Sequence, residues 1–368
     1  MLGKKSIAAL RTIVTLGKYV KIHPYDWDQF SESVIITKSR MQRIIFYSMT
    51  FHMWMEAAYQ STVLVAEIND PNVSFEAYLK LALHFVSRLT SCVITTSTVL
   101  ETKREIAEFY RLSIRLNYFF EEHLHENRRD HVWIILWGYV LFVYAHPFGV
   151  MFSYISESRA SRYWHSKLVP VHIYPYTIPA FAMLELLVSF WANFGPIFYA
   201  WSLVIHSFTS YSWIEAMILT NTSDPARKRA QHLYRTLQIY DRVYNNLVGY
   251  AWTFGIGALL FIHILCNSLT VRFFHTVVFP ANVVMALTMF MLGWVARVLY
   301  RRASGLATLS AEFARTYRLS QSKLLRSFGY SCNIINVEVR PFFYMKRLTP
   351  LTYIRLVLDN TINILLVT

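Results

Sequence analysis

Residues 247–271, LVGYAWTFGIGALLFIHILCNSLTV, form a long apolar stretch without any Asp, Glu, Lys or Arg. A helix needs about 20 mostly apolar residues to cross the hydrocarbon core of a bilayer, so this stretch predicts a transmembrane helix. The composition agrees, because only 16% of the 368 residues are charged and 55% are hydrophobic. Soluble domains carry about 25% charged residues. The sequence therefore predicts a membrane protein.

Similar stretches lie on both sides of this one. The stretch at 78–100 is the least apolar of them, because it contains His84, Arg88 and a run of Thr and Ser. Together they predict an all-α, polytopic membrane protein with seven transmembrane helices. The predicted helices cover residues 43–66, 78–100, 131–155, 176–205, 247–271, 274–297 and 348–368.

Lysine and arginine alternate along the connections between these helices. Basic residues stay on the cytosolic side of a membrane, so the pattern predicts a cytosolic N-terminus, an outer C-terminus and a multi-pass protein of the plasma membrane. The net charge of +14 fits contact with anionic membrane lipid and not with nucleic acid, because the basic residues are spread between apolar runs. The basic connections are 1–42, 101–130, 206–246 and 298–347.

Two of the basic connections have amphipathic patterns, at 101–127 and 306–327. Apolar residues recur there at helical spacing among charged ones. We expect their apolar faces to pack on each other below the membrane.

The last predicted helix, residues 348–368 (LTPLTYIRLVLDNTINILLVT), carries polar residues at membrane depth. Arg355 and Asp359 are four residues apart, so they share a face and can pair, and Asn363 continues that face. Polar groups in a membrane usually face protein or water. Either this helix lines an aqueous path with a hydrophobic constriction, or its polar side chains pair with neighbours inside a bundle.

Two segments resemble the insect gustatory and odorant receptor superfamily. The N-terminal run Lys18–Asp28, KYVKIHPYDWD, looks like the segment that precedes the first span in that family. Its C-terminal hallmark is Thr-Tyr, five apolar residues and Gln-Phe. Thr352-Tyr353 matches the opening, but Arg355 interrupts the apolar run. An alignment that starts at Thr361 keeps five residues before Thr368, and we prefer it because it preserves a full span.

The resemblance implies a chemosensory receptor that acts as a ligand-gated, non-selective cation channel. Four subunits would form a homotetramer, or a heterotetramer with a co-receptor, and the seventh helix of each would line the central pore. A gustatory role is preferred over an odorant role. The gate would fall at Leu365 on the preferred alignment. The pore and gate candidates are Leu358, Asp359, Ile362, Asn363, Leu365 and Leu366.

The resemblance also divides the chain into four parts. Residues 1–42 form a cytosolic segment, 43–297 hold six transmembrane helices with a ligand pocket in their outer half, 298–347 form a cytosolic anchor, and 348–368 form the pore helix. A tastant or odorant would occupy an aromatic pocket with a few polar groups. Aromatic residues are common in this chain, at 16%, so packing alone would give a similar set. The pocket candidates are Tyr144, His146, Phe148, Phe152, Tyr176, Phe181, Met183, Glu185, Phe261, His263 and Phe279.

Two other classes compete with this interpretation. Asp241-Arg242-Val243-Tyr244 resembles the ionic-lock tripeptide of G-protein-coupled receptors, but it precedes the fifth predicted helix and does not end the third. A transporter or membrane enzyme would show an internal repeat, a phosphate loop or a Gly-x-Ser-x-Gly motif, and the sequence has none. Cys92, Cys266 and Cys332 have no metal-binding spacing. We therefore expect three free thiols, no cofactor, no metal and no enzymatic activity.

Overall fold

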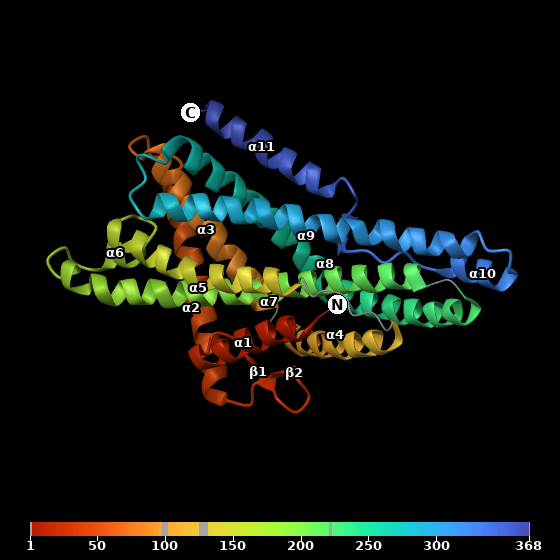
Figure 1. The fold of residues 1–368 in the computed structure, drawn as a ribbon. Helices are drawn as coiled ribbons and strands as arrows, with labels where there is room; N and C mark the ends of the chain where they lie inside the picture. Colours follow the sequence, from red (N-terminus) through yellow and green to blue (C-terminus); the bar gives the residue numbers. More distant parts are fainter. Residues whose placement is uncertain (1, 98–101, 125–131, 221–222, 368) are drawn as a thin grey trace.

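The fold is described from a computed structural model, which covers residues 2–97, 102–124, 132–220 and 223–367 and is mostly helical (Figure 1). Residues 98–100, 131 and 368, at the edges of three predicted helices, lie outside the described residues. The elements are α1 (Lys4–Val20), β1 (Tyr25–Asp28), β2 (Ser33–Ile36), α2 (Arg40–Glu67), α3 (Phe75–Thr96), α4 (Lys103–Leu124), α5 (Val132–Ser156), α6 (His165–Leu168), α7 (Tyr174–Thr220), α8 (Asp224–Phe273), α9 (Ala281–Arg318), α10 (Lys323–Ser331), β3 (Glu338–Val339), β4 (Phe343–Tyr344) and α11 (Thr349–Val367).

Each predicted transmembrane stretch lies largely within one helix: α2, α3, α5, α7, α8, α9 and α11 in turn. Helices α7 and α8 extend far beyond their predicted stretches. The stretch predicted at 274–297 is wrong at its start, since α9 begins only at Ala281. Pro280 explains the difference, because the residue before a proline is disfavoured in a helix and proline donates no backbone hydrogen bond.

Five of the described helices are long and apolar enough to cross a membrane: α3, α5, α7, α8 and α9. Helices α2 and α11 are not among them. Both carry polar side chains along their length, including Glu56 and Gln60 in α2 and Arg355 and Asp359 in α11. The composition and the helix lengths thus indicate a helical, multi-pass membrane protein. That the chain crosses the membrane seven times stays a prediction.

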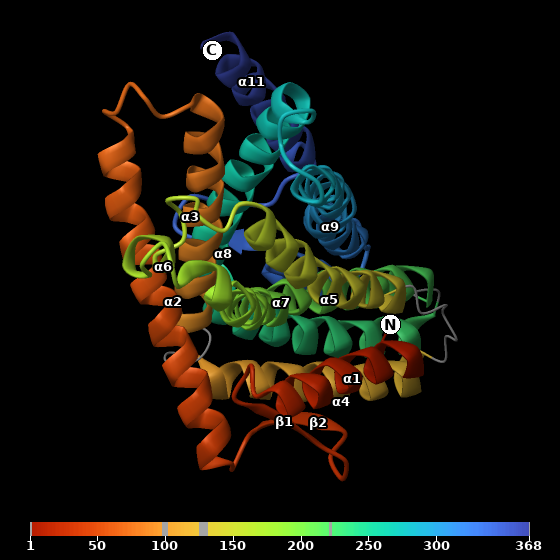
Figure 2. The same cartoon turned by 90° about the vertical axis from the view of Figure 1, so that its left-hand side faces the viewer.

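The helices run back and forth between two ends of the molecule. The connections α2–α3, α5–α7 and α8–α9 and the C-terminus gather at the upper left of Figure 1. Helix α1, the β1–β2 hairpin, α4 and α10 lie toward the lower and right-hand sides. Helices α2 and α3 stand side by side, as Figure 2 and their contacts agree. We name the first end the loop end and the second the basic end.

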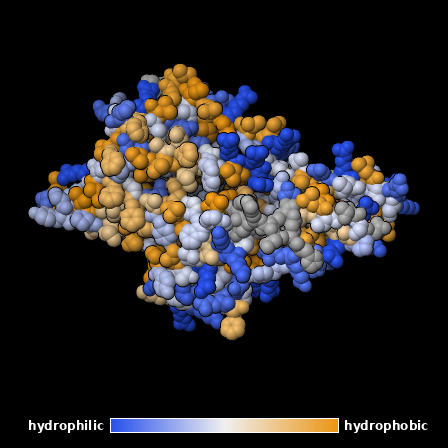
Figure 3. Space-filling view, viewed as in Figure 1, coloured by the Kyte–Doolittle hydropathy of each residue, from blue (hydrophilic) through white to orange (hydrophobic). Residues whose placement is uncertain are grey.

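The surface hydropathy follows the same division. In Figure 3 the hydrophobic side chains gather over the left and upper part of the molecule, and the hydrophilic ones dominate the right and lower edges. Many large apolar side chains are exposed, among them Leu141, Phe254 and Phe290. Such a surface suits hydrocarbon and not water.

Aromatic side chains fill the core at the basic end. The ring of Trp213 in α7 stacks on Phe120 of α4 at 4.3 Å between ring centroids, and Tyr234 of α8 stacks on Phe313 of α9 at 4.4 Å. Helices α4 and α9 each pack on α7 and α8. The two amphipathic connections therefore bury their apolar faces mainly against this helix pair, and the prediction that they pack on each other is wrong.

The N-terminal residues form a small unit that the sequence analysis did not predict. Strands β1 and β2 pair antiparallel, with Tyr25 opposite Ile36. Helix α1 packs on α5 and on β1, burying Leu10 and Ile13. His23 lies wholly buried beside Phe198 of α7, with the rings 5.0 Å apart. Burial lowers the pKa of His23 to about 4, so this imidazole is neutral at pH 7.

Candidate functional site

Three charged side chains meet at the crossing of α2, α3 and α7. Arg88 of α3 lies between two carboxylates, with its Nε atom 3.3 Å from Glu56 Oε2 and its Nη2 atom 3.0 Å from Glu185 Oε2. All three residues are at most 4% exposed. A charge buried within apolar helices is costly unless it is paired, so each of these charges depends on the others.

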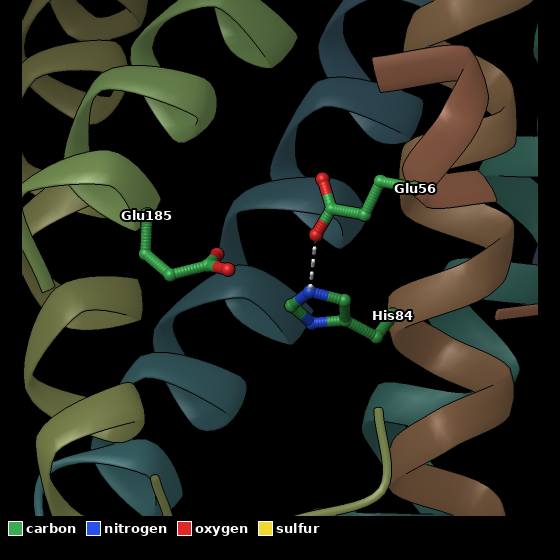
Figure 4. Close-up of side chains that lie close together, drawn as sticks. All are labelled: Glu56, His84 and Glu185. Atoms are coloured by element: carbon green, nitrogen blue, oxygen red, sulfur yellow. Dashed lines mark ion pairs between the residues drawn. The ribbon is translucent and has the colours of Figure 1, made fainter. Parts of the chain in front are cut away.

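His84 adds a fourth group to this triad. It lies one helical turn before Arg88, and its Nε2 atom is 4.0 Å from Glu56 Oε1 (Figure 4). One ligand atom each from Glu56, His84 and Glu185 lies within 4.8 Å of the others, which is close enough to hold a metal ion. The Arg88 guanidinium already pairs with both carboxylates, however. A metal could bind there only if that arginine moved away.

A cavity of about 150 Å³ borders this cluster. Helices α3, α5, α7, α8 and α9 all contribute to its walls, together with the α5–α7 connection. Its lining combines polar and apolar side chains, which is the character of a site for a small amphiphilic molecule. The polar lining residues include Lys80, His84, Arg88, His146, Arg162, Ser189 and Asn193, and the apolar ones include Leu83, Val150, Ala192, Ile262, Cys266, Val284 and Met285.

An ion-pair network closes the cavity toward the loop end. Lys80 Nζ lies 2.7 Å from Glu157 Oε1 and 2.8 Å from Glu76 Oε1. Arg162 Nη2 lies 2.7 Å from the second oxygen of Glu157. Burial alone would raise the pKa of the Glu157 carboxyl, but Arg162 and Lys80 hold that pKa below its usual range. These contacts tie the α5–α7 connection to α3.

Aromatic rings of the same connection pack over the helices. The ring of His165 stacks on Phe181 of α7 at 4.1 Å, and Tyr163 contacts Tyr154 of α5 edge-on at 4.9 Å. The hydroxyl of Tyr59 in α2 donates to the carbonyl of Ser161 at 2.9 Å. The connection therefore forms an ordered cover over the loop end of the cavity.

The structure brings two of the predicted pocket residues to this site. His146 lines the cavity, and its Nδ1 atom is 3.1 Å from the Asn193 amide nitrogen. Glu185 lies behind the cavity wall, where it holds Arg88. These are the two ionisable residues that the sequence analysis placed in the third and fourth predicted helices.

The other nine predicted pocket residues do not line this cavity. Tyr144 packs its ring near Phe190 and Phe194, and Phe181 supports His165. His263 faces α11, with its Nδ1 atom 3.3 Å from the Tyr353 hydroxyl. Phe279 precedes α9 and is not part of it. The remaining predicted residues, together with Phe279, are large side chains between 46% and 85% exposed: Phe148, Phe152, Tyr176, Met183, Phe261 and Phe279.

Helix α11 packs on α8 and α9 through one stripe only. Tyr353, Val357 and Thr361 are each at most 6% exposed, and the side-chain amide of Asn267 lies 3.5 Å from the Thr361 hydroxyl. The spacing of a helix places four residues on the opposite face. These are Arg355, Asp359, Ile362 and Leu366, which are all exposed.

The predicted pore and gate residues are distributed around this exposed surface. Ile362 and Leu366 point directly away from the stripe, while Leu358 and Asn363 flank that face and are also exposed. Leu365 is partly buried, and its carbonyl accepts a hydrogen bond from Arg272 at 3.3 Å. Arg355 Nε lies 3.4 Å from Asp359 Oδ2, as their spacing predicted.

Sequence reasoning missed most of the cluster, although a signal was present. Arg88 and His84 marked the second predicted helix as unusually polar, and Glu56 lies in the middle of the first. An ionised residue at membrane depth needs a partner of opposite charge. Glu56 and Glu185 each lie in a predicted transmembrane helix and need a basic partner, and Arg88 lies in another such helix. This requirement alone predicts that the three side chains meet.

The fold is similar to that of a known receptor. The insect olfactory receptor OR5 from Machilis hrabei in complex with eugenol superposes with a TM-score of 0.63 at 11% sequence identity, over 98% of this chain and 100% of that chain. A second structure of the same receptor gives a TM-score of 0.62 over the same shares. No family model matches the chain, and no curated protein matches its sequence. The arrangement of helices is thus that of an insect olfactory receptor.

Proposed function

We propose that this chain belongs to the insect gustatory and odorant receptor superfamily and acts as a ligand-gated, non-selective cation channel. The observation that carries the proposal is the shared fold, which extends over nearly the whole of both chains. The function follows by analogy of fold, and the site chemistry below supports it independently.

The cavity beside Arg88 is the proposed ligand site. The matched receptor was solved with eugenol, a small phenol that also carries a methoxy group. Here the wall contributed by α3 offers Lys80, His84 and Arg88 as hydrogen-bond donors, which favours a ligand with at least one strong acceptor. Water-soluble tastants more often carry such groups than volatiles do, so we favour a gustatory role over an odorant one.

A mechanical link between this site and α11 supports the gating step. Ile262 and Cys266 of α8 line the cavity, while His263 and Asn267 on the adjoining face of the same helix contact α11. Met285 of α9 borders the cavity and packs in the same small cluster as Ile364 of α11. A ligand that shifts α8 or α9 therefore shifts α11 as well.

The exposed face of α11 is the proposed pore surface. Four copies of the chain, or this chain with a co-receptor, would bring these faces together around a cation path. Ile362 and Leu366 would form the hydrophobic constriction, with Leu365 beside them and Asp359 one turn deeper. This arrangement requires seven crossings, a cytosolic N-terminus and an outer C-terminus at the plasma membrane.

Expression of the chain alone in oocytes tests the proposal. Currents are recorded while a panel of tastants and volatiles, eugenol included, is perfused, with Leu366→Ala and Leu365→Ala beside the wild type. We expect a ligand-evoked cation current, and a leak or altered threshold in Leu366→Ala. A C-terminal tag accessible only after permeabilisation would contradict the topology and favour a G-protein-coupled receptor. Substrate uptake without current would favour a transporter.

A further inference from the structure

A groove with four arginines lies far from the proposed ligand site. It has a volume of about 990 Å³ and is bordered by α9, by the end of α7 and by the start of α11. Arg297, Arg301, Arg302 and Arg347 line it, with Glu312 as the one acidic residue among its lining residues. The groove therefore presents a concentrated positive charge.

Most of this charge is not neutralised within the described part of the chain. Arg302 lies over the ring of Tyr211, with its guanidinium carbon 4.7 Å from the ring centroid. Arg297, Arg301 and Arg347 are exposed, and the described residues offer none of them a carboxylate within ion-pair distance. Arg297 and Arg301 are four residues apart on one helix, a spacing at which like charges repel. An anion in the groove would remove this repulsion.

The groove lining also includes apolar side chains, and some of them belong to the proposed pore helix. Val298 and Leu309 come from α9, and Leu351 and Ile354 come from α11. Arg297 is the last residue of the predicted transmembrane stretch 274–297, and Arg301 and Arg302 follow it on α9. A site with cations at the membrane boundary and apolar side chains beside them matches a molecule with an anionic head and hydrocarbon tails.

We infer that this groove binds an anionic phospholipid, with its phosphate groups on Arg297, Arg301 and Arg347 and its acyl chains against Val298, Leu351 and Ile354. The inference rests on the proposed orientation, in which this end faces the cytosolic leaflet, where anionic lipids are enriched. It does not depend on channel activity.

A second copy of the chain fits this groove less well than an anionic lipid does. The segment 298–347 contains nine basic and two acidic residues, so the same surface of another copy would repel it. Because Leu351 and Ile354 lie in the first turns of α11, the bound lipid would hold the start of that helix against α9. Lipid composition would then set the resting position of the proposed pore helix.

The test measures lipid binding to the purified full chain in a neutral detergent. Native mass spectrometry is run with dioctanoyl phosphatidylinositol 4,5-bisphosphate, with dioctanoyl phosphatidylcholine and with the water-soluble inositol trisphosphate head group. The groove variant is Arg301→Gln/Arg347→Gln. The control variant is Arg104→Gln/Arg115→Gln, which removes the same charge from exposed positions of α4.

We expect the anionic lipid to bind the wild type and the control variant equally, and the groove variant about 10- to 30-fold more weakly, from about 1 kcal/mol per arginine. Arg301→Lys/Arg347→Lys should retain most of the binding, which separates charge from misfolding. Equal loss in both Gln variants would overturn the inference, as would equal binding of phosphatidylcholine. A head group that binds as tightly as the lipid would indicate a free-anion site. A change of oligomeric mass without a change of lipid stoichiometry would indicate a second copy.

Discussion

The two ends of the molecule bury polar groups in opposite ways. At the basic end, His206 Nε2 lies 3.1 Å from Asp241 Oδ1, and the His206 ring stacks on Tyr244 at 3.9 Å, within a core that aromatic rings fill. At the loop end, the Glu56–Arg88–Glu185 triad borders an open cavity. Aromatic rings thus pack densely around the buried pair at the basic end. At the loop end the buried charges adjoin free space, which is what a binding site needs.

Truncation of one side chain at each end should reveal this difference most strongly. Trp213→Ala removes a fully buried side chain from the basic end, and we expect a loss of about 3–5 kcal/mol in unfolding free energy, because the surrounding rings cannot collapse into the void. Met285→Ala enlarges an existing cavity and should cost about 2 kcal/mol, the low end for this substitution, because Met285 is only partly buried. Thermal unfolding of the purified variants measures both. Equal losses would remove the distinction between the two ends.

The buried triad gives the next largest effect. Arg88→Met leaves two carboxylates buried without their partner, and we expect a loss of about 3 kcal/mol, at the low end for broken buried pairs because the cavity can admit water. Arg88→Met/Glu56→Gln/Glu185→Gln removes all three charges and should recover most of that stability. If the triple variant were as unstable as the single one, the loss would come from packing and not from charge.

Acidification should loosen the N-terminal unit at the basic end. The pKa of His23 falls from an ordinary 6.5 to about 4 in the fold, so the stability that neutral His23 contributes is present above pH 6.5 and is lost as pH falls toward 4. Between pH 7 and pH 5 this amounts to about 2 kcal/mol. Amide hydrogen exchange of α1 and β1 at both pH values measures it. His23→Leu, a matched apolar variant, should show no such pH dependence.

The ion-pair network that closes the cavity toward the loop end should have the smallest effect on stability. Glu157 is partly exposed, so Glu157→Gln should lower the unfolding free energy by only about 0.5–1 kcal/mol. The pKa of Glu157 is depressed in the fold, so its contribution is present at neutral pH and is lost as pH falls through that depressed pKa. Thermal unfolding at neutral pH measures the change. A loss of several kcal/mol would mean that this ion-pair network is needed for the stability of the fold and does not merely cover the cavity.

The sequence predicted the helices better than the site. Apolar runs located α5 and the C-terminal end of α8 within two residues, because hydrocarbon imposes a minimum length on any crossing helix. Because aromatic residues are common throughout this chain, their positions say little about where a ligand pocket lies. The aromatic pattern predicts Tyr176 and Phe261 as pocket residues, although both are exposed. His146 and Glu185 were informative, because a buried ionisable group needs a partner. The cavity itself depends on how five helices cross, which periodicity along one chain does not specify.

The most direct test of the central claim fills the cavity. Met285→Trp places a larger side chain in the cavity, and Leu287→Trp places the same ring on the exposed side of the same helix, where Leu287 is 57% exposed. Concentration–response curves are recorded in oocytes with the first agonist found for the wild type, and surface expression is matched. If the cavity is the ligand site, Met285→Trp abolishes the evoked current and Leu287→Trp preserves it. An unchanged response in Met285→Trp, or equal loss in both variants, would contradict it.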